Sequence, residues 1–150
     1  MKVRLLVLGF LVAALVAILL QAAPQQERAI PVSVVALIAT PEKFDGKLVY
    51  VTGYLRIEEE GDTLYLSEAD YLHALLRNGI WVERTAEMER DIEKLDSKYV
   101  GIVGHFSAKD RGHMSASSGG LVKIRSCTFW SDPKYPIVRR LEDERRKSPR

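Results

Sequence analysis

The chain has almost no cysteine with which to cross-link itself. Cys127 is the one cysteine among 150 residues, so no intramolecular disulfide can form and packing alone must hold the fold. The absence of any earlier cysteine excludes a lipid-modified N-terminus. We expect Cys127 to be a small buried residue of a strand rather than a reactive thiol, which is how free cysteines usually behave.

Motifs for catalysis and metal binding are missing too. The serine-rich stretch 115–118 lacks the G-x-S-x-G pattern of a nucleophile elbow. His105, Asp110 and His113 are suitable metal ligands by type, but their spacing fits no established zinc pattern. The acidic stretch 58–62 lacks the ligand array of a calcium loop. We therefore expect no enzyme, no metal site and no cofactor; a metal-dependent hydrolase using His105 and His113 is the distant alternative.

An excess of charge of one sign is absent from the chain as a whole, but the charge is segregated. The formal net charge is +2, and the tail 133–150 alone holds seven basic and three acidic residues. Residues 24–132 hold 13 basic and 17 acidic residues, so this part is net negative. Neutralisation of phosphates by cations supplies most of the affinity for nucleic acid. The composition therefore disfavours nucleic acid as a partner.

A basic start and a long apolar run open the chain. Lys2 and Arg4 precede residues 5–20, which are apolar or small, and polar chain resumes directly afterwards. This is the architecture of a secretion signal. We expect residues 1–23 to be a signal peptide and the protein to be periplasmic or secreted.

An uncleaved anchor is the alternative for the same segment. Gln21 or Leu20 stands where a signal peptidase prefers a small residue, and Pro24 disfavours cutting after Ala23. Sixteen apolar residues span about 24 Å at about 1.5 Å each, less than a hydrocarbon core of roughly 30 Å. Anchoring in the inner membrane therefore requires residues 5–23, and would give the protein its membrane contact.

The pattern of the remaining chain predicts one small barrel. After a polar linker over 24–32, a helix starts at Ser33 and stops before Pro41. Apolar alternation predicts five strands, at 47–57, 63–67, 80–83, 98–106 and 121–129. A helix over 85–95 separates the third strand from the fourth. This order predicts an all-β domain with added helices over 33–130, a five-stranded barrel of the OB (oligonucleotide/oligosaccharide-binding) type, followed by a charged, partly helical tail over 131–150.

Three stretches strengthen this interpretation. The stretches are FDGKLVYVTGYL, LYLSEAD, and KYVGIVGHFSAKDRGHM followed by GGLVKI. They resemble uncharacterised exported bacterial OB-fold proteins that are similar to the tRNA-anticodon-like domain group. The resemblance covers roughly residues 33–130. It implies the barrel and a ligand-binding ancestry, and it carries over no catalytic residue.

Strand parity assigns the side chains to two faces. The inward set is Val49, Val51, Gly53, Leu55, Ile57, Leu64, Leu66, Ile80, Val82, Val100, Ile102 and Phe106. Gly53 in this set allows the first strand to bend sharply, as closure of a small barrel requires. The outward set includes Tyr50, Tyr54, Arg56, Tyr65 and Trp81.

The outward set predicts the candidate ligand surface. Tyr54, Arg56, Tyr65 and Trp81 would lie close together on a face with which OB folds commonly bind ligands. Their rings would stack on bases or sugars, or would instead pack under the N-terminal helix or a loop. The leading hypothesis is an exported binding module whose unknown ligand is a saccharide, peptide or small molecule, with the 107–120 loop as a movable flank. The alternative is an envelope interaction or scaffold protein, which includes binding by edge-strand addition.

Overall fold

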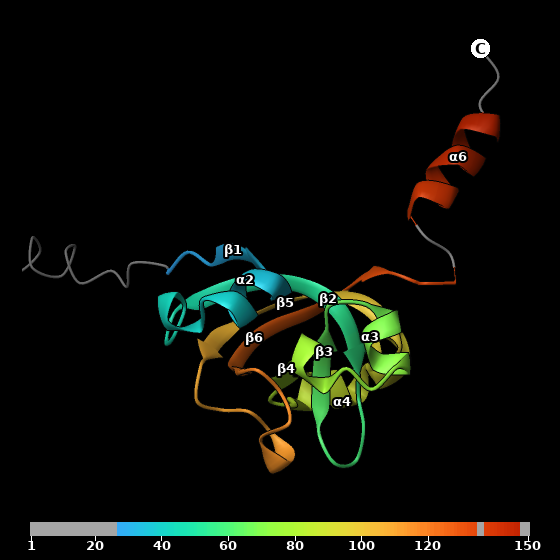
Figure 1. The fold of residues 1–150 in the computed structure, drawn as a ribbon. Helices are drawn as coiled ribbons and strands as arrows, with labels where there is room; N and C mark the ends of the chain where they lie inside the picture. Colours follow the sequence, from blue (N-terminus) through green and yellow to red (C-terminus); the bar gives the residue numbers. More distant parts are fainter. Residues whose placement is uncertain (1–26, 135–136, 148–150) are drawn as a thin grey trace, which may run out of the picture.

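The structure, a computed structural model, describes residues 27–134 and 137–147 (Figure 1). The predicted export signal, residues 1–23, lies outside this range. Within the described residues, no helix has the length and apolar character needed to cross a membrane. Residues 27–134 contain the barrel, and the helix α6 (Ile137–Lys147), within the predicted charged tail, projects away from it (Figure 1).

Five strands close into the barrel that the sequence predicts. They are β2 (Leu48–Arg56), β3 (Asp62–Tyr65), β4 (Gly79–Val82), β5 (Lys98–Ser107) and β6 (Gly120–Ser131). Their order is β2-β3-β4-β6-β5, and β5 pairs back onto β2. The pairs are antiparallel except β4–β6, which is parallel. This closed mixed barrel with short added helices is of the OB type, so the predicted fold class is confirmed.

Short helices connect the strands. They are α2 (Val34–Ala39), α3 (Glu68–Leu72), α4 (Ala86–Arg90) and α5 (Ile92–Leu95), with 3-10 turns η1 (Pro41–Lys43), η2 (Leu76–Asn78) and η3 (His113–Ser115). Ser33 caps α2 by accepting a hydrogen bond from the Ala36 backbone, as its position before the apolar run indicates. The single helix predicted over 85–95 is instead two helices, because the backbone leaves the helical conformation at Asp91.

A strand that the sequence did not predict precedes α2. β1 (Ile30–Ser33) pairs in parallel with β2, with Ile30 opposite Val49 and Ser33 opposite Thr52. The predicted polar linker over 24–32 is therefore wrong from Ile30 onward, where the chain forms β1. The reason is tertiary, because β3 pairs with β2 only from Tyr54 on and leaves the preceding edge of β2 open.

The long strand β2 is shared by both halves of the barrel. It pairs with β5 from Leu48 to Leu55 and with β3 only at its last three residues. A Cβ atom at Gly53 would lie 2.5 Å from the backbone oxygen of Tyr65. Glycine is therefore required where β2 turns from one neighbour to the other and the backbone of β3 approaches closely.

The barrel interior follows the predicted alternation with one exception. Ten predicted or adjacent inward residues are fully buried: Val49, Val51, Leu55, Leu64, Ile80, Val82, Val100, Ile102, Phe106 and Leu121. Met88 and Leu95 add to this core from α4 and α5. Leu66 was predicted to face inward, but it is 42% exposed, since β3 ends at Tyr65 and the alternation ends with it.

Candidate ligand surface

Tyr54 and Tyr65 occupy the outer face, as parity predicts, but they are covered. Their exposed fractions are 3% and 4%. The ring of Tyr71 on α3 lies 6.2 Å from that of Tyr54 and 5.7 Å from that of Tyr65, between centroids. Tyr99 of β5 approaches Tyr54 edge-on at 5.6 Å. Of the two alternatives for these rings, the structure therefore shows the packed one, and the cover is α3 rather than the N-terminal helix.

Burial also sets the protonation of these two hydroxyls. It raises the pKa of both Tyr54 and Tyr65 above the ordinary tyrosine value. Both side chains are therefore neutral at physiological pH. They are packing residues of an aromatic cluster that fixes α3 on the barrel.

Arg56 belongs to the same cluster and is neutralised within it. Its Nη1 donates to both carboxylate oxygens of Asp96, at 2.8 and 3.0 Å, and its Nη2 donates to Glu58 at 3.3 Å. The guanidinium carbon lies 4.6 Å from the ring centroid of Tyr71. Asp96 also accepts a hydrogen bond from the backbone of Ile57 at 2.9 Å. Arg56 therefore joins β2 to the α5–β5 connection and is not presented as a free cation.

Of the three aromatic residues predicted for the site, Trp81 is the one that stays partly exposed. It points outward from β4 between the inward Ile80 and Val82, which confirms its predicted parity. The β5–β6 loop lies directly on its ring, since a Cβ at Gly112 would be 2.4 Å from the ring; a Cβ at Gly120, the first residue of β6, would be 3.1 Å from it. On the β2–β3 turn, a Cβ at Gly61 would lie 3.6 Å from the indole nitrogen.

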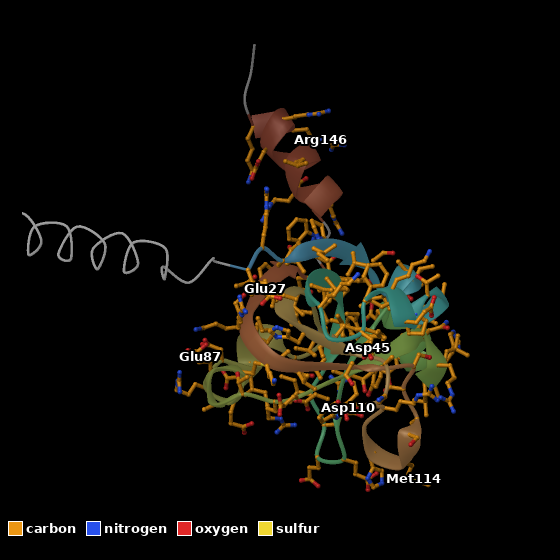
Figure 2. The ribbon with its side chains drawn as sticks, turned by 90° about the vertical axis from the view of Figure 1, so that its left-hand side faces the viewer. Glu27, Asp45, Glu87, Asp110, Met114 and Arg146 are labelled. Carbon is orange, nitrogen blue, oxygen red and sulfur yellow. The ribbon has the colours of Figure 1, made fainter. Side chains whose placement is uncertain are left out.

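Backbone hydrogen bonds hold the covering loop in place. The Trp81 backbone donates to the carbonyl of Gly119 at 2.9 Å, and the Ser118 backbone donates to the carbonyl of Gly79 at 3.0 Å. Met114 marks the tip of this loop and extends away from the barrel (Figure 2). The Trp81 surface is thus bounded by a fixed β4 edge and by a loop whose tip is exposed.

The acidic β2–β3 turn has a structural role at one of its residues. The side chain of Asp62 is 1% exposed and accepts from Arg84 at 2.6 Å and 2.9 Å. Arg84 also donates to the backbone carbonyl of Glu58 at 2.8 Å. This ion pair, in which Asp62 is buried and Arg84 is 35% exposed, ties the turn to the segment after β4, and Glu59 and Glu60 stay exposed at the tip.

The histidines considered as metal ligands lie on different elements. His105 is in β5, where its Nε2 lies 3.3 Å from a carboxylate oxygen of Glu27, whereas His113 is in η3. Asp110 lies in the loop before η3. Among the described residues, no three histidine, cysteine or acidic side chains are grouped so that they could hold a metal ion.

A buried carboxylate beside the aromatic cluster gives a pH-dependent prediction. Asp70 of α3 accepts from the Ser67 hydroxyl at 2.5 Å and from the Asn78 amide at 2.6 Å, and these bonds hold its pKa below the ordinary aspartate value. The native state therefore binds this proton more weakly than the unfolded state, whose pKa is about 3.9. The resulting stabilisation is complete above about pH 5 and is lost as the pH falls through the native pKa.

We expect Asp70→Asn to lower the free energy of unfolding by about 1 to 2 kcal/mol at neutral pH, because charged hydrogen bonds are lost. Urea unfolding at stepwise lower pH should show the difference from the natural protein shrinking as the carboxyl is protonated. Asp110→Asn, at an exposed position, is the control. A difference that stays constant down to strongly acidic pH would contradict the assignment.

Comparison with known proteins adds little to this geometry. No family model matches the sequence, and no curated protein matches it. Among solved structures, the chain resembles a protein assigned as an aspartyl-tRNA synthetase from Leishmania major Friedlin, with 11% identity and a TM-score of 0.43. The match covers 73% of this chain and 22% of that one, so this chain spans about a fifth of that protein's length.

Proposed function

We propose that this protein is an exported, non-catalytic binding module of the bacterial cell envelope that holds its ligand against Trp81 on the outer face of β4. The observation that carries the proposal is the partly exposed indole between the β2–β3 turn and the β5–β6 loop. Ligands of OB folds are held on this face and by these two loops. The basic start and apolar run of residues 1–23 support export, by cleavage or by anchoring.

The charges around Trp81 favour a neutral or zwitterionic ligand. The exposed Glu59 and Glu60 lie on the turn at one side, and the exposed Lys109 and Arg111 lie on the loop at the other. A polyanion would be repelled by the turn, and Arg56 is already paired with Asp96. A saccharide combines an apolar ring face, which packs on an indole, with hydroxyl groups that suit the exposed polar backbone of glycine-rich loops. We therefore propose a saccharide ahead of a nucleic acid.

The test follows the indole of Trp81 in the full chain. Trp130→Phe leaves one tryptophan, so that its Nε1–H signal can be followed in ¹H–¹⁵N spectra during titration with a short N-acetylglucosamine oligomer, a mixed peptide or a single-stranded oligonucleotide. We expect the signal to shift with the oligosaccharide and not with the oligonucleotide. Shifts confined to other surfaces would contradict the proposed site.

Replacement of the indole separates binding from stability. We expect Trp81→Ala to lower the free energy of unfolding by about 1 to 2 kcal/mol, because a half-buried ring loses its contacts with Gly112 and Gly120. Saccharide affinity should fall by at least about tenfold, which corresponds to 1.4 kcal/mol. Trp130→Phe should leave the affinity unchanged. A Trp81→Ala protein that binds normally would overturn the proposal, whatever its stability.

A further inference from the structure

β6 has an edge that the barrel leaves unpaired. β4 pairs with β6 only at Gly120 and Leu121. The chain then leaves β4 through Glu83, whose carboxylate accepts the backbone N–H of Lys123 at 2.7 Å. From Ile124 onward, no strand of the described range pairs with this side of β6, whereas β5 pairs with the other side. An edge of free backbone N–H and C=O groups can accept another extended chain.

A groove runs beside this edge. A cavity of about 580 Å³ separates residues 124–127 of β6 from the α4–α5 segment. Ile124 contributes an apolar side chain from the strand and Ala86 does so from the helices, whereas Met88 and Leu95 belong to the core and are only 1% and 4% exposed. Glu87 lies on the helical side of the groove, on a different side of the barrel from Met114 (Figure 2). The groove is therefore a second surface, separate from the loop tip beside Trp81.

We propose that an extended segment of a partner protein adds to β6 as a further strand in this groove. Only an extended backbone can satisfy a row of strand N–H and C=O groups, and alternate side chains of such a segment would then face the helices. The groove supplies both: the unpaired edge of β6 for the backbone of the segment, and the α4–α5 segment for its alternate side chains. This inference is independent of the proposed saccharide site, since it rests on different residues.

The side chains along β6 specify the partner segment. Ala86 and Ile124 would contact apolar residues on one face of the added strand. Lys123 and Arg125 are exposed on β6 and call for acidic residues at the alternate positions. Arg125 is already paired within the chain, with Glu27 at 2.7 Å, so an acidic residue of the partner would have to share or replace that carboxylate. The partner segment is therefore one in which acidic and apolar residues alternate.

The same strand limits pairing between two barrels. Along the part of β6 that lacks β4, the ladder with β5 is regular only from Ser126 to Phe129, with irregularities on both sides, and Lys123 has a positive φ of 49°. Bulges and short regular edges are features that prevent edge-to-edge association of whole domains. Phe129 and Trp130 are 50% and 53% exposed farther along β6, where they extend the contact surface for a peptide. A partner segment is thus favoured over a second copy of the chain.

The test uses the full chain and a short fluorescein-labelled peptide of alternating glutamate and valine. We expect saturable binding by fluorescence anisotropy, with slowed amide exchange and shift changes at residues 124–129. Ala86→Trp, which fills the groove, and Arg125→Glu should each weaken binding at least about tenfold, or 1.4 kcal/mol. Lys43→Glu, an exposed charge reversal elsewhere, should leave it unchanged, and thermal unfolding of each variant confirms that it is folded.

A second peptide tests the backbone pairing itself. The same sequence with alternate backbone nitrogens methylated keeps its charge and side chains but cannot complete a strand ladder, so we expect it not to bind. Equal binding of both peptides would overturn strand addition, as would no binding of the first peptide or shift changes confined to the Trp81 surface. Sedimentation that shows a dimer abolished by Ala86→Trp would assign the groove to a second copy and would also overturn the proposal.

Discussion

Phe106→Ala is expected to lower the free energy of unfolding by about 4 kcal/mol, the largest loss from any single substitution considered for this barrel. Phe106 is the largest of the fully buried side chains. Its ring packs so closely under the end of the β5–β6 loop that a Cβ at Gly119 would lie 2.7 Å from it. Truncation would leave a cavity that neither strand nor loop can fill without moving.

Urea unfolding of the full chain measures this loss. Phe129→Ala is the matched control, because that ring lies on β6 but is half exposed. We expect the control to cost about 1 kcal/mol or less. Equal losses at the two positions would contradict the inward orientation of Phe106 and with it the alternation assigned to β5.

Arg84→Met is expected to cost about 3 kcal/mol, because it leaves the buried carboxylate of Asp62 without its charged partner. The substitution also removes the bond from Arg84 to the Glu58 carbonyl, so the β2–β3 turn loses its attachment to the segment after β4. Arg90→Met, at an exposed position on α4, should change the stability by about 0.5 kcal/mol or less.

A double-mutant cycle isolates this ion pair. Asp62→Asn removes the buried charge, so the double variant Asp62→Asn/Arg84→Met should be less destabilised than the sum of the two single variants. We expect a coupling energy of about 1 to 3 kcal/mol from urea unfolding. Additive losses would show that the two side chains do not stabilise the fold as a pair.

The strands of the barrel were predictable because each carries its own alternation. Buried residues alternate along β2 at Val49, Val51 and Leu55, and along β5 at Val100 and Ile102. Wherever one side of a sheet is buried, the odd or even position of a residue decides which face its side chain occupies. Leu66 shows the limit of that reasoning, since parity holds only as long as the strand continues. β1 shows a second limit of prediction from alternation. A four-residue strand that contains Pro31 has little pattern of its own, and it forms because β2 leaves an edge open.

The candidate site was predictable in part for the same reason. Parity placed Tyr54, Tyr65 and Trp81 on the outer face, and the structure agrees. It could not show what lies on top of that face. Tyr71, from the segment between the second and third predicted strands, covers the two tyrosines, whereas Gly112 of the β5–β6 loop and Gly120 of β6 lie against Trp81 and leave it partly exposed. Contacts between segments far apart in the chain leave no periodic signal in either segment.

The sequence by itself determined the five-stranded barrel and the inward face of its first four strands, because hydrophobic alternation and glycine at a bend are local properties of the chain. Only the tertiary structure decided which outward side chains remain accessible and where the barrel keeps a free edge. Arg56 is neutralised by Asp96, forty residues away, and β6 loses its β4 neighbour after Leu121. Both outcomes depend on how distant segments meet when the barrel closes, and that depends on the packing of the whole domain.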